Sequence, residues 1–332
     1  MKISIILPTF NRSKILTQTI KNVQNQTFED YELIIINDAS NDETINIIKQ
    51  FKAIDGRIKL INNNKNIGCA KSREFGLKQS LGELIVFIDD DDQWNNNKLM
   101  EQYNAIVHTN SNMVISDYYI LMNGNKIHKK MNLFAQKFKK QILKRPGPFF
   151  QSIMIKKELI KKIRNPFDSE SIPSEDWNFF IELSKLNPTI SYIDKPLFTW
   201  NIHDENQSLN LTKEAKALDY IINKHYDYIK AEHGLKVIAN HYRRIARIYE
   251  KKIDVESKQY HSRQDLPDLY CTTGGLYTRQ RHLLENYTGD DFAMGIRRKG
   301  ICLTDIEAVN IDSMIDYHFA KFLFNNNEIK EK

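Results

Sequence analysis

Residues 84–94 read LIVFIDDDDQW, an apolar run that ends in four consecutive aspartates. A short and continuously apolar run of this kind predicts a strand buried on both faces of a sheet. The four carboxylates repel one another unless a cation or solvent neutralises them, and such oxygen ligands suit Mg²⁺ or Mn²⁺. The alternative is a solvated acidic loop that leads into a turn at residues 95–97. Because the aspartates follow the strand directly, we favour the metal site.

Similar apolar runs precede this stretch at Ile3–Leu7, Glu32–Ile36 and Arg57–Ile61. The segments between them carry apolar residues at helical spacing. Alternating strands and helices predict βαβ units and a mostly parallel sheet, in which ligands bind at the carboxyl ends of the strands. We therefore expect the functional site in the segments that follow the strands, namely residues 8–12, 37–38, 62–68 and 89–92.

Two of these segments are weak signals when taken alone. Asp38 stands where an acidic residue of such folds contacts a base or ribose, but it also begins a turn and a helix that Ser40 would cap. Residues 66–68 precede a helix whose first N–H groups would face a phosphate. Neither a Walker loop nor G-x-G-x-x-G follows the first strand, which argues against a P-loop NTPase or a Rossmann dehydrogenase.

The middle of the chain predicts further strands at Met113–Ser116, Phe149–Ile155 and Thr189–Ile193. A helix is expected from Glu175 to Leu186 with Ser174 as its cap. Residues 211–250 read as one long helical connector. Trp94 and Trp177 are either packing residues or platforms for a sugar, and the sequence does not separate the two.

The composition narrows the class of protein. The chain has 332 residues, of which 41% are hydrophobic, and a net charge of +6, so it is long enough for a real core and too apolar for disorder. Residues 126–164 hold thirteen Lys and Arg against one acid, so that this window nets +12 and the rest of the chain −6. A general nucleic-acid binder is therefore not expected.

The sequence also predicts where the protein works. Three scattered cysteines do not make a disulfide framework or a zinc site. The N-terminal apolar run stops at Pro8, too short for a signal peptide, and no apolar run reaches the roughly 18 residues of a membrane span. We expect a cytoplasmic protein, either free or peripheral at a membrane.

Five blocks together carry a family resemblance: SIILPTFNR, IINDASNDET, NKNIGCAKSREFGL, FIDDDDQW and SEDWNFFIEL. In this order and spacing they resemble the family 2 glycosyltransferases of the GT-A fold. The resemblance covers about residues 1–210 and implies a Rossmann-like, mostly parallel α/β domain. It further implies an inverting glycosyltransferase that moves a sugar from a nucleotide-diphosphate sugar, with a UDP-sugar favoured, to a glycan or lipid-linked acceptor.

The resemblance also implies roles for individual residues. Asp176 matches the base that takes the acceptor's proton, and Asp91 matches the metal ligand of a DxD-type element. His203, in FTWNIHDENQS, is either a further ligand for Mn²⁺ or Mg²⁺ or merely structural. The alternative for Glu175 and Asp176 is that they only complement a helix N-terminus. The residues expected to bind the nucleotide sugar are Pro8, Thr9, Asn11, Arg12, Asp38, Asn66, Gly68, Arg73, Asp89 and Asp90.

A second resemblance concerns the tail. RQDLPDLYCTTGGLYTRQRHLL and VNIDSMIDYHFAKFLF are similar to the C-terminal part of the CMP-sialic acid synthetase (acylneuraminate cytidylyltransferase) family. It implies sugar contacts at Arg263 and Tyr277 and a metal-binding match at Asp312, whereas Asn310 stands where that family has an aspartate. The N-terminal loop with which that family binds its nucleotide has no counterpart in this sequence. We therefore expect a remnant used for packing, homo-oligomerisation or acceptor recognition, with retained sugar binding as the alternative.

These expectations combine into one organisation. Residues 1–210 form the catalytic domain, 211–256 a helical connector, and 257–332 a small α+β tail that resembles part of a cytidylyltransferase. The basic window at 126–164 is either a solvated lysine-rich surface over a phenylalanine core or a seat for an anionic acceptor or a membrane surface. The alternatives for function are a bifunctional or CMP-sugar-related nucleotidyltransferase and a non-catalytic glycan-binding protein.

Overall fold

The computed structural model describes residues 1–122, 124–201, 210–257, 301–303 and 329–331. The chain divides into two compact units, Met1–Leu209 and Asn210–Lys332. The first unit contains the predicted βαβ segments and every one of the five family-like blocks. The predicted division of the chain into three parts stays a prediction.

A nine-stranded sheet forms the centre of the first unit, in the order β3-β2-β1-β4-β8-β6-β9-β5 with β7 paired to β6. Its strands are β1 (Ile3–Thr9), β2 (Tyr31–Asn37), β3 (Ile58–Asn62), β4 (Leu84–Phe87), β5 (Gln93–Trp94), β6 (Met113–Met122), β7 (Asn125–Lys129), β8 (Ile153–Lys156) and β9 (Ile190–Asn201). Its longer helices are α1 (Leu16–Gln24), α2 (Thr44–Ile54), α3 (Cys69–Gln79), α4 (Lys98–Thr109) and α8 (Glu175–Ser184). Shorter helical turns are α5 (Asn132–Gln136), α6 (Phe138–Ile142), η1 (Phe150–Ser152), α7 (Lys157–Ile160) and η2 (Ser169–Ser171).

Strands β1 to β4 run parallel, and their carboxyl ends meet at one edge of the sheet. The register pairs Thr9 with Asn37 and Asn37 with Asn62, while Ile6 pairs with Phe87. Every residue of β1 and β2 is buried, as expected for strands covered on both faces. The predicted α/β architecture is confirmed, and it brings the segments after these four strands together.

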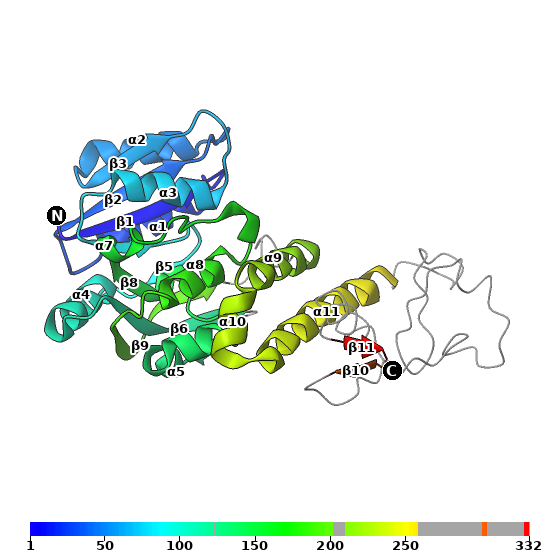
Figure 1. Cartoon of the computed structure of the whole chain (residues 1–332). Coiled ribbons are helices and arrows are strands. Elements are labelled where there is room, and N and C mark those ends of the chain that lie inside the picture. Colours follow the sequence, from blue (N-terminus) through cyan, green and yellow to red (C-terminus); the bar gives the residue numbers. More distant parts are fainter. Residues whose placement is uncertain (123, 202–209, 258–300, 304–328, 332) are drawn as a thin grey trace. The chain divides into compact units, whose positions relative to one another are not determined.

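Helix α3 packs closely on this part of the sheet, as Figure 1 shows for α3 across β1 and β2. The close approach depends on Gly76, where an added Cβ would lie 2.6 Å from the Ile6 side chain and 2.9 Å from that of Ile36. Gly68 begins the helix with a φ of 85°, a backbone conformation that glycine adopts readily. The two glycines therefore fix both the depth and the start of α3.

Several local predictions were wrong in detail. The segment 149–155 was expected to be one strand, but residues 150–152 form a 3₁₀ turn and only β8 is extended. The strand expected to end at Ile193 continues in β9 to Asn201, because it pairs with the long strand β6. Helix α2 starts at Thr44, and Ser40 does not cap it, since the Ser40 hydroxyl accepts a hydrogen bond from the Asn11 backbone N–H.

The second unit begins with three helices where the sequence predicted one continuous stretch. They are α9 (Leu211–Lys224), α10 (Tyr226–His233) and α11 (Leu235–Ser257). The helix breaks at His225 and again at Gly234, whose φ of 71° lies outside the range of a right-handed helix. Farther along, β10 (Ile301–Leu303) and β11 (Ile329–Glu331) pair antiparallel. Among the helices that the structure describes, none has both the length and the apolar character needed to cross a lipid bilayer.

Candidate active site

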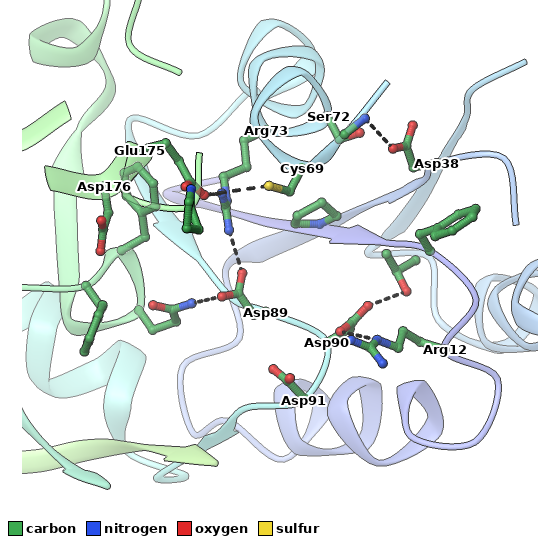
Figure 2. Close-up of a pocket in the computed structure, with 18 of the residues that line it drawn as sticks. Arg12, Asp38, Cys69, Ser72, Arg73, Asp89, Asp90, Asp91, Glu175 and Asp176 are labelled. Carbon is green, nitrogen blue, oxygen red and sulfur yellow. Dashed lines mark hydrogen bonds and ion pairs between the residues drawn. The ribbon is translucent and has the colours of Figure 1, made fainter. Parts of the chain in front are cut away.

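A cavity of about 340 Å³ opens at the carboxyl ends of β1, β2 and β4. Figure 2 shows Asp38 and Asp176 toward opposite sides of it, with Arg73 and Asp89 between them. Among the predicted site residues, those that line the cavity are Pro8, Thr9, Arg12, Asp38, Asn66, Gly68, Arg73, Asp89, Asp90, Asp91 and Asp176. The fold thus gathers residues that are up to 168 positions apart in the sequence around one space.

Asn11 is the described candidate that does not line this cavity. Its φ of 54° turns the chain after β1, and its side-chain oxygen accepts a hydrogen bond from the Asn41 N–H at 2.9 Å. The backbone N–H of Asn11 bonds to Ser40 at 2.9 Å. Asn11 therefore joins the loops after β1 and β2, and its contact with the nucleotide sugar stays a prediction.

The Asp38 carboxylate organises the loop that leads into α3. Its oxygens accept hydrogen bonds from the backbone N–H of Gly68 at 2.8 Å and of Ile67 at 3.0 Å, and from the side-chain amide of Asn63 at 2.8 Å. The side chain is almost completely buried. Asp38 and the segment 66–68, each a weak signal in sequence, are thus parts of one hydrogen-bonded unit.

The four aspartates after β4 have different surroundings. Asp89 faces Arg73 at 2.8 Å and accepts a hydrogen bond from the Gln151 side chain. Asp90 accepts from the Thr9 hydroxyl at 2.8 Å and lies 3.3 Å from the Arg12 guanidinium, while burial raises its pKa to about 7 against the opposing effects of Thr9 and Arg12. The run is therefore a set of individually placed carboxylates and not a uniformly solvated loop.

Asp92 is the most enclosed member of the run. Both of its carboxyl oxygens are buried without a hydrogen-bond partner, and burial and then the neighbouring aspartates raise its pKa well above the usual range. Asp91 lines the cavity itself. Repulsion between the neighbouring carboxylates contributes to these raised pKa values, and a bound cation would relieve it.

The donor set fits a divalent cation that is shared with a phosphate ligand. Among the residues that the structure describes, no three His, Cys, Asp or Glu side chains are grouped to chelate a metal by themselves. Mg²⁺ is commonly held by one or two carboxylates together with substrate phosphates, so Asp91 at the cavity wall meets the protein's share of that requirement. His203, the other predicted ligand, lies outside the described residues.

Arg73 occupies the centre of the site and joins its two halves. Its guanidinium is 2.8 Å from Asp89 Oδ1 and 2.6 Å from Glu175 Oε1, and only 5% of the residue is exposed. It also lies over the Phe150 ring at 5.1 Å. Its ion pairs link the aspartate loop to α8, and its predicted contact with the nucleotide sugar stays a prediction.

Asp176 lies in the first turn of α8, beside Glu175. Its pKa is raised to about 7, first by burial and then by the negative charge of Glu175, while a hydrogen bond from the Trp177 N–H and the charge of Arg73 oppose the rise. Ser174 occupies the predicted cap position of α8, but its side chain makes no capping hydrogen bond. The Trp177 indole donates to the Ile142 carbonyl at 2.7 Å, which anchors the helix.

Residues that the sequence did not single out complete the wall around Asp176. Phe149, Phe150, Gln151, Pro173 and Trp200 all line the cavity. The phenylalanine core expected under the basic window at 126–164 consists of Phe134, Phe138, Phe149 and Phe150. Phe134, Phe138 and Phe150 are buried, whereas Phe149 is only partly buried. The one available signal for Trp200 was its position in the block that contains His203.

The basic window does not form a single patch. The β6–β7 hairpin carries Lys126 to Lys130 at the edge of the sheet where β4 has its carboxyl end, because β8 lies antiparallel between β4 and β6. Lys156, Lys157 and Lys161 line a separate hollow at the opposite edge, next to Leu84. Of the two groups, only the hairpin lies at the edge of the sheet that holds the cavity.

Comparison with known proteins identifies the family. The profile described as Glycosyl transferase family 2 matches residues 4–164. The E. coli UDP-Glc:alpha-D-GlcNAc-diphosphoundecaprenol beta-1,3-glucosyltransferase WfgD is 30% identical over 185 residues, which cover 56% of this chain and 70% of WfgD. The chain belongs to glycosyl transferase family 2.

Another relative is more similar to this chain, but over a smaller share of its own length. The Staphylococcus aureus poly(ribitol-phosphate) beta-N-acetylglucosaminyltransferase TarP is 37% identical over 188 residues, which cover 54% of this chain but only 57% of TarP. The present chain thus spans little more than half the length of that relative.

Solved structures of glycosyltransferases show the same GT-A fold. S. aureus TarS 1–349 in complex with UDP-GlcNAc has a TM-score of 0.55 at 18% identity and covers 84% of this chain and 97% of that one. The mannosyltransferase PcManGT from Pyrobaculum calidifontis, in complex with GDP-Man and Mn²⁺, has a TM-score of 0.56 at 14% identity and covers 79% of this chain and 76% of that one. At these identities the likeness concerns the fold.

The predicted tail site lies outside the described residues. Arg263, Tyr277 and Asp312 belong to it, and the family match at residues 4–164 ends well before them. The resemblance of the tail to a cytidylyltransferase, and its use for oligomerisation or sugar binding, stay predictions.

Proposed function

We propose that the protein is an inverting glycosyltransferase that moves a sugar from a UDP-sugar to a hydroxyl of a glycan or a lipid-linked glycan, with a divalent cation. The observation that carries this proposal is the placement of Asp176 in the same cavity as the aspartates after β4. A carboxylate with a pKa near neutrality is suited to take a proton at physiological pH. The aspartate cluster is suited to a cation that a nucleoside diphosphate also binds.

The two sides of the cavity have separate roles in this reaction. Asp38 and the loop it organises face the nucleoside, and Arg12 beside Asp90 faces the phosphates. Asp176 accepts the proton of the acceptor hydroxyl while that oxygen attacks the anomeric carbon from the face opposite the departing diphosphate. The new glycosidic bond forms as the bond to the diphosphate breaks, which inverts the configuration at that carbon.

The cation would be held by Asp91 together with diphosphate oxygens. When bound, it neutralises the negative charge that develops on the leaving nucleoside diphosphate. PcManGT, which has the same fold, was solved in complex with GDP-Man and Mn²⁺, and this supports a divalent cation in the present site. Mn²⁺ or Mg²⁺ is therefore the proposed cofactor.

The relatives support the proposed substrate classes. The TarS structure is a complex with UDP-GlcNAc, and the name of WfgD specifies a UDP-Glc donor and a diphosphoundecaprenol-linked acceptor. The name of TarP instead specifies a polymer of ribitol phosphate. Each name describes that protein, and together they favour a uridine nucleotide for this chain.

A donor screen tests the proposal. Thermal shift and donor hydrolysis are measured with UDP-, GDP- and CMP-sugars, with and without Mn²⁺, on wild type, Asp91→Asn and the control Asp30→Asn, which removes an exposed carboxylate. We expect a Mn²⁺-dependent shift with a UDP-sugar that Asp91→Asn loses and Asp30→Asn keeps. If Asp91→Asn shows the same Mn²⁺-dependent shift in melting temperature as wild type, Asp91 does not hold the cation.

The same screen addresses the two alternative functions. Release of pyrophosphate from CTP and an acidic sugar would support the nucleotidyltransferase alternative. No stabilisation by any nucleotide sugar would favour a non-catalytic protein.

We further propose that the lysines of the β6–β7 hairpin and of the helices after it attract an anionic membrane surface on which the acceptor is carried. The hairpin and the following helix also expose the apolar side chains of Met122, Ile127 and Leu133. Apolar side chains next to lysines are typical of a surface that binds anionic lipids.

Vesicle sedimentation tests this surface. The triple change Lys126→Ser, Lys130→Ser and Lys140→Ser is compared with Lys49→Ser, Lys52→Ser and Lys65→Ser, which remove the same charge from exposed positions elsewhere in the first unit. We expect only the first set to lose binding to phosphatidylglycerol vesicles. Equal loss in both sets, or no binding by wild type, would overturn this part of the proposal.

A further inference from the structure

The cavity has an aromatic wall on the side of Asp176. Trp200 and Phe149 line it with their ring centroids 4.9 Å apart, and both side chains are only partly buried. The other two tryptophans of the chain do not line the cavity: Trp94 is 4% and Trp177 1% exposed, so both are packing residues. The aromatic surface available to a ligand next to Asp176 is therefore that of Phe149 and Trp200.

This wall is rigid because it is the end of an aromatic stack. Tyr118 contacts Phe149 edge-to-face at 5.4 Å and is stacked on Phe198 at 5.1 Å. The Phe149 carbonyl accepts hydrogen bonds from the backbone N–H of Ser152 at 3.0 Å and from the Ser152 hydroxyl at 2.7 Å, which fixes the backbone at Phe149. Trp200 is held in β9, opposite Ile120 of β6. Rigid rings of this kind lose little conformational freedom when a ligand binds to them.

The wall stands between the two groups that define the reaction. Asn201, the neighbour of Trp200, donates a hydrogen bond to the Asp91 carbonyl at 2.7 Å, which ties the strand end to the aspartate loop. Burial and then the charge of Asp176 raise the pKa of Tyr118, so the proposed base lies close to the stack behind Phe149. A ligand resting on the wall thus lies beside both the base and the metal-binding loop.

We infer that Phe149 and Trp200 form the acceptor subsite and that its occupant is a hexopyranose ring, stacked through its C–H face with one hydroxyl directed at Asp176. The inference rests on the proposed function and adds the class of the acceptor. An apolar ring face matches the flat aromatic surface, whereas an open-chain polyol offers no such face. The acceptor end therefore fits a ring sugar of the kind named in WfgD and not the ribitol phosphate named in TarP.

Intrinsic fluorescence provides a direct test, because Trp200 is the tryptophan that lines the cavity. Wild-type protein saturated with UDP and Mn²⁺ is titrated with the methyl β-pyranosides of glucose, galactose and N-acetylglucosamine, and with ribitol as the open-chain control. We expect a saturable change in emission with at least one pyranoside and none with ribitol. A change with ribitol, or with none of the pyranosides, would overturn the assignment.

Kinetics then separate an acceptor subsite from a donor subsite. With the pyranoside that binds, Trp200→Leu is expected to raise the acceptor KM about tenfold, which is the size of effect that a lost aromatic contact gives. The KM for UDP-sugar hydrolysis in the absence of acceptor stays unchanged. Trp200→Phe recovers most of the acceptor affinity, and the control Phe75→Leu, at an exposed ring on α3 outside the cavity, changes neither constant.

The outcomes distinguish the inference from the function on which it depends. If Trp200→Leu raises the donor-hydrolysis KM as much as the acceptor KM, the wall holds the donor sugar and the inference fails while the glycosyltransferase function stands. If it changes neither constant and its melting temperature equals that of wild type, the rings are only packing. If wild type neither binds UDP nor hydrolyses a UDP-sugar, the proposed function itself fails.

Discussion

At the Asp38 end of the cavity the key carboxylate is already saturated by backbone and side-chain amides, whereas at the Asp176 end the carboxylate is held near its point of titration. The side chains that line the two ends of the cavity also differ in polarity. Asp38 is surrounded by a polar loop that leads into the N-terminus of α3, while Asp176 shares its side of the cavity with Phe149 and Trp200.

This difference matches the two tasks of a group-transfer enzyme. A group that only has to hold a nucleoside benefits from being fixed before the ligand arrives. A group that has to accept a proton needs a pKa near the working pH and a ligand placed against it. Changes at the two ends should therefore affect different constants, and the group between them, Arg73, should affect both.

The largest effect is expected from Asp176→Asn. Removing the proton acceptor should lower kcat for transfer by about a thousandfold, within the range attributed to general bases. The UDP dissociation constant should stay that of wild type, because Asp38 and the aspartates after β4 are intact. Steady-state transfer and calorimetric titration with UDP and Mn²⁺ measure the two quantities. A variant that kept wild-type turnover would exclude Asp176 as the base.

Arg73→Met should affect both ends at once. The substitution leaves Glu175, which is 8% exposed, and Asp89 without their positively charged partner side chain. Breaking such a buried ion pair costs about 3–5 kcal/mol of stability. Because the aspartate loop and α8 are then displaced, turnover should fall by about a hundredfold, which is the usual effect of a misplaced reacting group. Urea unfolding and transfer kinetics measure the two effects.

A second variant separates structure from chemistry at Arg73. Adding Glu175→Gln to Arg73→Met removes one of the stranded charges and should return part of the lost stability without returning the activity. Recovery of full activity in the double variant would show that Arg73 acts only through Glu175. A fully stable Arg73→Met protein would show that its two ion pairs do not join the halves of the site.

Asp38→Ala should weaken the donor end alone. Loss of the acceptor for the Ile67 and Gly68 N–H groups loosens the loop before α3 and costs about 1–3 kcal/mol for the hydrogen bonds to a charged group. We expect the UDP dissociation constant to rise by about tenfold, which corresponds to 1.4 kcal/mol. The acceptor KM should not change. A change in acceptor KM with unaltered UDP binding would contradict the separation of the two ends.

The donor end was largely predictable from the sequence, because its signals are local. The buried strand in LIVFIDDDDQW is followed closely by four aspartates, and Asp38 comes directly after β2. These signals place side chains at known ends of parallel strands without further information. What the sequence lacked there was the partner of each carboxylate. The hydrogen bonds from residues 63–68 to Asp38, and the internal ion pairs of Arg73, depend on distances between loops that spacing alone does not give.

The acceptor end was mostly missed, because it depends on strand order. Strand β8 lies antiparallel between β4 and β6, and β9 pairs with β6 through two shifts of register, so the positions of Gln151 and Trp200 follow from neighbours far away in the chain. In the sequence Phe149 looked like a core residue because it is one of several phenylalanines in the basic window. Asp176 alone was found at this end, and it was found through resemblance to a family.

The smallest expected effect concerns the pH dependence of the acceptor end. Transfer requires the ionised form of Asp176, so kcat/KM should rise with pH and level off above the raised pKa of about 7, falling tenfold for each unit below it. Burial is the main cause of that raised pKa and Glu175 is the second. Glu175→Gln removes the neighbouring negative charge, so the pKa of Asp176 falls and the acid limb moves to lower pH by a fraction of a unit.

The control Glu182→Gln makes the same substitution on the same helix, away from the cavity, and should leave the acid limb in place. If the acid limb of the pH profile does not move in Glu175→Gln, or moves equally in Glu182→Gln, the titration belongs to a group other than Asp176. The two ends of the cavity would then not differ in the way proposed, with a titrating carboxylate at the acceptor end and a fixed one at the donor end.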